Sequence, residues 1–172
     1  REAQALQAQT TPSLLAWQQQ MQQWPQAAPR ERLLLQAGAV TLDDWIDGLQ
    51  ERAEPAPPEG SRRCWFALEP RTLLNQKGEL QAYKLMPLYV RSLALSATGA
   101  NALMCVIARD TMVWVQHVEQ TVAKSRLQAL MGLWLQGQNT AVPLPLKTAI
   151  KAAKDDLNAA AQEYEGGFML GG

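Results

Sequence analysis

The sequence predicts a mixed α/β domain, in which a central sheet of four or five strands is flanked by helices. Its 172 residues are 47% hydrophobic, which is enough for one domain with a real core. Apolar residues recur with a period of two in some stretches and at helical spacing in others, and these stretches alternate along the chain. Glycine and proline separate them.

Residues 1–37 are predicted to form a helical N-terminal segment that precedes a domain spanning 38–172. The first 36 residues contain ten glutamines. Leu14, Trp17 and Met21 fit the faces of a helix, although Pro12 interrupts the run. We interpret this segment as a solvated helix or spacer, with a partner-docking arm as the alternative.

The alternation that begins at Val40 and ends near Asp47 predicts the first strand. The stretch Glu51–Gly60 contains three prolines and is predicted to be a loop. Arg63–Leu68 is predicted to be the next strand.

A helix is expected to start near Lys84, with Pro87 in its first turn, and to end at Gly99. Leu103–Ala108 is apolar on both faces, which is typical of a buried central strand. A short turn then leads to Met112–Val118, so the two strands should pair as a hairpin.

A second helix is expected over Thr121–Gln136, ended by Gly137, and a third over Thr148–Glu165, stopped by Gly166 and Gly167. Pro143 and Pro145 should hold the intervening loop extended. The residues expected on the buried face of the second helix, with Arg126 at its edge, are Val122, Arg126, Ala129, Leu130, Leu133 and Trp134.

The composition excludes several classes of function. The net charge is zero, so the chain should bind DNA weakly on its own, because neutralisation of phosphates supplies most of that affinity. Cys64 and Cys105 are expected to be buried free thiols, and the single histidine, His117, has no recognised metal-site spacing with them. We expect no cofactor.

The location and extent of the chain can also be interpreted. No apolar stretch approaches the roughly 20 residues needed to cross a bilayer, and the Gln-rich start does not resemble a signal peptide, so we expect a cytoplasmic protein. The chain begins with Arg1 rather than Met and stops at Gly171 and Gly172, so we expect a piece of a longer protein.

Acidic residues at strand ends suggest a test for a nuclease metal site. Many nucleases hold Mg²⁺ between carboxylates of neighbouring strands, with a lysine two residues after the second acid. Asp44 or Asp47 could supply the first acid, and Glu69 and Arg71 could stand in place of the second acid and the lysine. Pro70 is poorly tolerated within a sheet, and arginine is not equivalent to lysine. The interpretation is a degenerate site without catalytic residues.

Two further groups of residues carry weaker signals. Arg62 and Arg63 form a basic pair beside a loop, which could contact a phosphate or be a solvated loop edge. Four tryptophans are expected in the core (Trp45, Trp65, Trp114 and Trp134). Trp17 and Trp24 are expected to be partly exposed until a partner covers them.

Five motifs in order resemble the C-terminal domain of RecC. They extend from residue 38 to the end, and are Val40–Leu49, Arg63–Leu68 followed by Pro70, Lys84–Leu93, Pro143–Ala149 and Tyr164–Met169. The resemblance implies the fold of the PD-(D/E)XK nucleases, a mixed sheet flanked by helices, with the catalytic residues lost.

The resemblance also implies a function. RecC is the non-catalytic scaffold subunit of RecBCD (exodeoxyribonuclease V), an ATP-dependent DNA helicase–nuclease of double-strand break repair and recombination. The implied partners are RecB, RecD and, within the complex, DNA, with no membrane and no small-molecule substrate. One alternative is an active Mg²⁺-dependent nuclease of the same fold, in which Asp47 and Glu69 converge on one cation. Another is a generic interaction domain.

Overall fold

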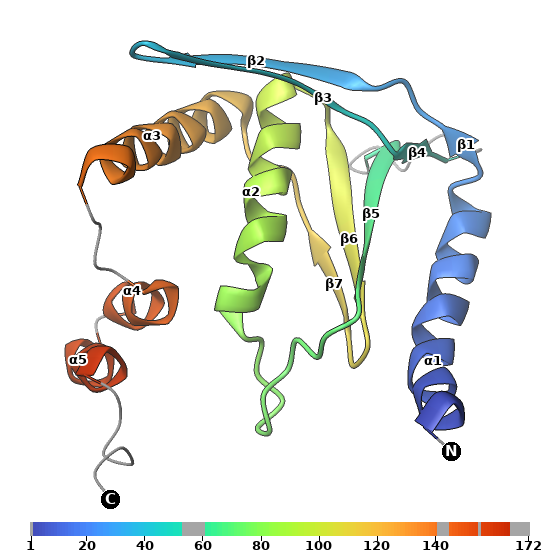
Figure 1. Ribbon diagram of the computed structural model, residues 1–172. Coiled ribbons are helices and arrows are strands. Elements are labelled where there is room, and N and C mark those ends of the chain that lie inside the picture. The colour runs from blue at the N-terminus through green and yellow to red at the C-terminus, as the bar shows by residue number, and fades with distance from the viewer. Residues whose placement is uncertain (1, 53–60, 141–144, 155, 166–172) are drawn as a thin grey trace, which may run out of the picture.

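The protein is built on a five-stranded mixed sheet with one long helix against each face (Figure 1). The computed structural model describes residues 2–52, 61–140, 145–154 and 156–165. Its elements are, in order, α1 (Glu2–Gln23), β1 (Gln26–Ala27), β2 (Glu31–Ala37), β3 (Val40–Ile46), β4 (Leu49–Glu51), β5 (Arg63–Glu69), α2 (Ala82–Thr98), β6 (Ala102–Ala108), β7 (Met112–Val115), α3 (Gln120–Asn139), α4 (Leu146–Ala152) and α5 (Leu157–Glu165). The predicted class, a mixed sheet flanked by helices, is confirmed.

The strands of the central sheet lie in the order β1-β4-β5-β6-β7. β5 and β6 are parallel, with Arg63 opposite Ala102 and Glu69 opposite Ala108, and α2 makes the crossover between them. The neighbouring strands β4 and β7 pair antiparallel with this central pair. The predicted hairpin of β6 and β7 is confirmed, although β7 ends at Val115.

Alternate residues of the central strands bury opposite faces of the sheet, as the period of two requires. Cys64, Phe66 and Cys105 pack with Trp24 at the end of α1. On the other face, Met104 packs in a cluster with residues of α2. Both cysteines are buried and free, as predicted.

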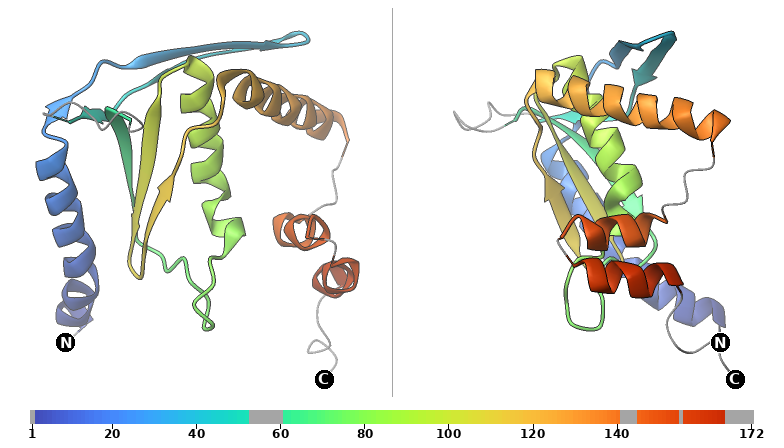
Figure 2. Two further views of the ribbon diagram at one scale, coloured as in Figure 1. Left: turned by 180° about the vertical axis from the view of Figure 1, so that it is seen from behind. Right: turned by 90° about the vertical axis from the view of Figure 1, so that its left-hand side faces the viewer.

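The strand predicted at Val40 does not belong to the central sheet, which corrects the expected architecture. β3 instead pairs antiparallel with β2 in a separate hairpin that turns at Gly38. Leu33 and Leu35 of β2 are buried against α2 and α3, with Leu42 of β3 packed beside them. The hairpin therefore lies over the C-terminal end of α2 and runs alongside α3 (Figures 1 and 2). Alternation predicted the strand but carried no information about which layer would cover it.

Helix α2 starts at Ala82, two residues earlier than predicted. Its first turn is tight, because Lys84 N donates to Gln81 O at 2.9 Å. Pro87 consequently lies inside the helix rather than in its first turn. The predicted end at Gly99 is confirmed, since Gly99 adopts the left-handed conformation with φ of 89°.

Helix α3 differs from the prediction in both its end and its buried face. It continues through Gly137 to Asn139, since a glycine within a helix weakens it without ending it. The buried residues are Ala123 and Leu127, not the predicted set. Leu133 and Trp134 are 54% and 57% exposed.

The single helix expected over 148–165 is two helices, α4 and α5, which pack side by side (Figure 2). Pro145 is extended, with ψ of 137°, as predicted. Glu51, the first residue of the loop predicted before Arg63, belongs to β4. Residues 53–60 of that loop, Pro143 and the predicted stop at Gly166 and Gly167 lie outside the described residues.

The N-terminal segment contains more than a helix. Pro12 lies inside α1 without ending it, and the strands β1 and β2 follow before residue 38. Because β2 pairs with β3, residues on both sides of position 38 form one hairpin. The division of the chain at residue 38 remains a prediction.

The predicted burial of the tryptophans was wrong for most of them. Trp24 is fully buried, whereas Trp45 and Trp114 are more than 40% exposed and Trp134 is more exposed still. Trp17 and Trp65 are half-buried. Trp24 is inaccessible because it closes the end of α1 over Phe66, with a ring-centroid distance of 6.1 Å.

Candidate functional site

The best-defined polar arrangement in the structure lies where β5 ends, at Glu69 and Arg71. Arg71 donates to both carboxylate oxygens of Glu69, with Nε–Oε1 at 2.8 Å and Nη2–Oε2 at 2.9 Å. The backbone N–H of Arg71 donates to Oε1 as well, at 3.1 Å. These hydrogen bonds lower the pKa of Glu69, although burial acts in the opposite direction. The carboxylate is therefore held charged in a bidentate pair.

The loop that carries Arg71 is tied to the β6–β7 turn by Asp110, a residue that the sequence analysis missed. Its carboxylate accepts hydrogen bonds from Leu73 N at 2.8 Å and from Leu74 N at 2.9 Å. Burial would raise the pKa of Asp110, but these hydrogen bonds, together with one from its own backbone N–H and the charge of Lys84, outweigh burial and lower the pKa. Its position in a turn next to two strands was the available signal, because such acids often bind backbone N–H groups.

Lys84 completes this end of the sheet from the start of α2. Its Nζ donates to Thr72 O at 2.7 Å, and its charge contributes to the lowered pKa of Glu69. The side chains of Glu69, Asp110 and Lys84 thus hold the backbone of the loop at residues 71–74 through hydrogen bonds. Because each of these charged groups already has a hydrogen-bond partner, the arrangement has a structural role, which is to fix the backbone of the loop.

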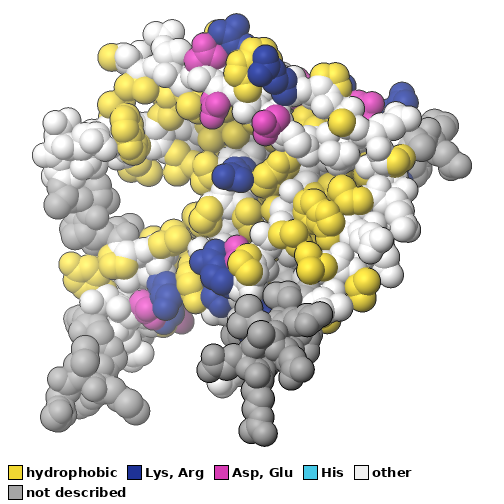
Figure 3. All heavy atoms as spheres, turned by 45° about the vertical axis from the view of Figure 1, so that its right-hand side comes forward, with side chains coloured by type: hydrophobic (Ala, Val, Ile, Leu, Met, Phe, Trp, Pro, Cys, Tyr) yellow, Lys and Arg dark blue, Asp and Glu magenta, His cyan; other side chains and the backbone are white. Residues whose placement is uncertain are grey.

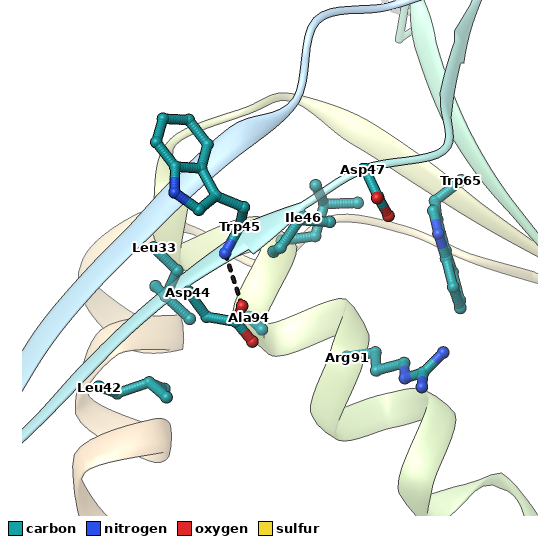
Figure 4. Close-up of a pocket in the computed structure, with 10 residues that line it drawn as sticks. Leu33, Leu42, Asp44, Trp45, Ile46, Asp47, Trp65, Arg91 and Ala94 are labelled. Atoms are coloured by element: carbon teal, nitrogen blue, oxygen red, sulfur yellow. Dashed lines mark hydrogen bonds between the residues drawn. The ribbon is translucent and has the colours of Figure 1, made fainter.

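Asp44 and Asp47 lie elsewhere, on the hairpin side of a pocket of about 300 Å³ (Figure 4). Asp44 accepts a hydrogen bond from Trp45 N at 2.7 Å. Opposite them, Arg91 of α2 lies 5.5 Å from the ring centroid of Trp65. The pocket combines two exposed carboxylates with a cation and an apolar floor.

The structure does not bring Glu69 into this pocket. Glu69 lines a separate hollow with Ser13, Leu14 and Arg109. Leu49, two residues after Asp47, is opposite Trp65, and Glu69 is four residues further along β5. At about 3.3 Å per strand residue, that is roughly 13 Å along the strand. Within the described part of the chain, no group of three or more His, Cys, Asp or Glu residues is placed to hold a metal ion.

The two arginines at the start of β5 have different environments. Arg63 is half-buried and donates to Glu51 at 2.7 Å and to Glu31, so two acids balance its charge. Arg62 is exposed and lines a cleft of about 520 Å³ together with Glu31 and Asn101. Of the pair, Arg62 is the one whose side chain faces solvent.

None of the described helices combines the length and the apolar character needed to cross a bilayer. The long helices α1 and α3 both carry many glutamines.

Comparison with protein families identifies the chain. Residues 1–157 match the family described as the RecC C-terminal domain. The match covers most of the chain and includes the first 37 residues, for which the sequence motifs gave no resemblance. It implies the role of a RecBCD complex subunit. On this evidence the chain belongs to the family of RecC C-terminal domains.

Proposed function

We propose that this chain is a non-catalytic scaffold domain of the RecBCD helicase–nuclease, which docks RecD and RecB in double-strand break repair and recombination. The family match carries the proposal. The exposed aromatic and aliphatic side chains on α3 support a docking role, because exposed apolar groups mark interfaces.

The fold is proposed to be a PD-(D/E)XK nuclease core that has lost its catalytic residues. The mixed sheet with a helix on each face agrees with such a core. The state of Glu69 supports the loss of function, since its carboxylate oxygens both accept from Arg71 and a shared cation would have to displace that pair. Asp47 lines a different pocket from Glu69.

DNA is proposed to be bound in the complex rather than by the isolated chain, whose net charge is zero. Arg62 is the better candidate for a phosphate contact. Arg63 would first have to give up Glu31 and Glu51. Within the assembled complex, Arg62→Ala should lower the slope of log Kd against log salt by about one, and Lys77→Ala, in an exposed turn, should leave it unchanged.

The proposal is tested by a pull-down of the chain against purified RecB and RecD, with labelled forked DNA and Mg²⁺ in a parallel reaction. Capture of a subunit without cleavage of DNA is the expected result. Metal-dependent cleavage that disappears in Glu69→Ala would instead establish the alternative, an active nuclease. Failure to capture either subunit would refute the docking role.

A further inference from the structure

An apolar groove runs between α2 and α3 on the side away from the central sheet. Its walls are formed by Met86, Tyr89 and Val90 of α2 and by Ala129, Leu130 and Leu133 of α3, and its volume is about 270 Å³. Figure 3 shows hydrophobic side chains bordering the open space between this part of the molecule and the α4–α5 pair. The face of α3 that the sequence predicted to be buried is thus one wall of an open groove.

The charges on both helices have one sign. α2 carries Lys84 and Arg91, α3 carries Lys124 and Arg126, and neither helix contains an aspartate or a glutamate. Lys84 lies near Glu69, and Arg91 lines the pocket that contains Asp44 and Asp47, so these two cations are directed toward other acids. Arg126 lies at the groove itself, where its Nη1 donates to the hydroxyl of Tyr89 at 2.5 Å.

The nearest acid along α3 is already engaged in capping the helix. Glu119 precedes α3, and its carboxylate accepts hydrogen bonds from Thr121 N and Val122 N, each at 3.0 Å. It lies seven residues before Arg126, roughly 10 Å along the helix axis, so it does not pair with the arginine that lines the groove. The potential at the groove favours a partner with negative charge.

The helical walls of the groove also determine which secondary structure a bound segment can have. Helix walls have their backbone hydrogen bonds satisfied internally, so they offer no edge to which a strand could add. The aliphatic lining, with Tyr89 as its one aromatic ring, is a poor platform for stacked bases. A second copy would oppose one basic surface to another. An apolar face of a helix, in contrast, is complementary to such a groove.

We propose that the groove binds one amphipathic α-helix of a protein partner, with apolar residues on one face and acidic residues flanking them. This deepens the proposed docking function and rests on it. Met86 to Leu93 spans roughly 10 Å of α2, about two helical turns. The partner's apolar anchors should accordingly recur at i, i+3 or i+4, and i+7.

The test uses fluorescence anisotropy with a stapled helical peptide of about 15 residues, the staple being needed because so short a helix is marginal in water. The peptide carries leucines at that spacing and glutamates beside them. Leu133→Glu, at an exposed groove position, should weaken binding by about tenfold or more. Leu34→Glu is the matched control, since Leu34 is 58% exposed on β2 and does not line the groove.

A second peptide with lysines in place of the glutamates separates charge from hydrophobicity. It should bind more weakly than the acidic peptide, and the difference should shrink as salt is raised. Equal binding of the two peptides, or equal loss in both leucine variants, would overturn the proposal.

The same variants in the pull-down with RecB and RecD separate this inference from the proposed function. Capture by the chain and by Leu34→Glu but not by Leu133→Glu supports both. Capture by all three keeps the docking role and overturns the groove as its site. If the chain captures neither subunit, the docking role fails, and the peptide experiment alone decides for or against the acidic helix.

Discussion

The pair of Glu69 and Arg71 shows how a charged group can close the end of a buried strand. The Glu69 side chain is only 10% exposed, whereas that of Arg71 is 60% exposed. The carboxylate is thus desolvated and depends on the arginine for its hydrogen bonds. A buried acceptor that loses its partners costs about 1–3 kcal/mol.

Arg71→Ala should therefore raise the pKa of Glu69 and reduce stability at neutral pH, because the carboxylate would keep only the hydrogen bond from the backbone N–H of residue 71. Because the pKa of Glu69 is lowered on folding, the pair stabilises the protein above the unfolded value of about 4.3 and this contribution is lost as the pH falls through the folded value. The acid-side loss of stability should be smaller in the variant. Urea unfolding from pH 7 to pH 3 measures it, and identical pH profiles would contradict the pair's role.

The tryptophans give a second prediction, since burial differs so widely among them. Trp24→Ala should destabilise the protein by about 3–5 kcal/mol, because it empties a fully buried site beneath α1. Trp134→Ala should change stability by no more than about 0.5 kcal/mol, since the side chain is exposed. Circular dichroism during urea unfolding measures both without depending on tryptophan fluorescence. A similar cost at the two positions would refute the assignment.

The sequence could predict which residues share a face but not which face would be covered. Trp45 and Trp114 lie on strands with the expected alternation, yet their side chains are more than 40% exposed. On α3 the apolar stripe is broad, and the core takes Ala123 and Leu127 beside it. Which of two adjacent stripes on α3 is buried depends on where α2 and the β2–β3 hairpin lie, and these positions are set by contacts between residues distant in the sequence. Asp110 escaped prediction for the same reason, because its partners lie in a distant loop.

Local chemistry at helix ends predicts the course of the chain better. Gly99 ends α2 as expected, because its left-handed conformation suits a residue without a Cβ atom. Gly137 does not end α3. The helix continues to Asn139, and the next residue, Thr140, has an extended backbone. A glycine indicates a helix end only where the following residues leave the helix.

Gly99→Ala should destabilise the protein by about 1–2 kcal/mol, which is the cost of placing a residue with a Cβ atom in the left-handed backbone conformation. A Cβ atom there would also come within 2.9 Å of Gln120 Nε2, which now donates to Ala97 O. Gly132→Ala is the internal comparison: it lies within α3 with open space around it, and should stabilise by about 0.8–1 kcal/mol. Thermal unfolding measures both, and a shift of the same sign would be inconsistent with the cap.

The arrangement of layers makes α1 a cover for one side of the central sheet. Cys64 and Cys105 lie beneath it with Phe66 and Trp24, and Ser13 of α1 donates to Ala108 O at 3.1 Å. Burial raises the pKa of the Cys105 thiol to about 12, and that of Cys64 further. The two thiols therefore report on whether α1 is in place.

Neither thiol should react with Ellman's reagent at pH 8 in the folded protein, since thiolate is the reactive form and both are buried. Both should react in guanidinium chloride. Trp24→Ala should accelerate the reaction under native conditions, because it loosens the end of α1. Rapid reaction of the unaltered folded protein would show that α1 does not cover this face.

The parallel pairing of β5 with β6 has a consequence for the speed of folding. The chain between Arg63 and Ala102 includes the whole of α2, so pairing β5 with β6 closes a long loop, whereas β6 and β7 are joined by a short turn. Pairings that are distant along the chain form late, because the entropy of closing the loop comes first. The β6–β7 hairpin should accordingly be structured in the folding transition state. Val113→Ala in β7 should slow refolding, and Ala67→Gly in β5 should mainly accelerate unfolding, as stopped-flow measurements would show.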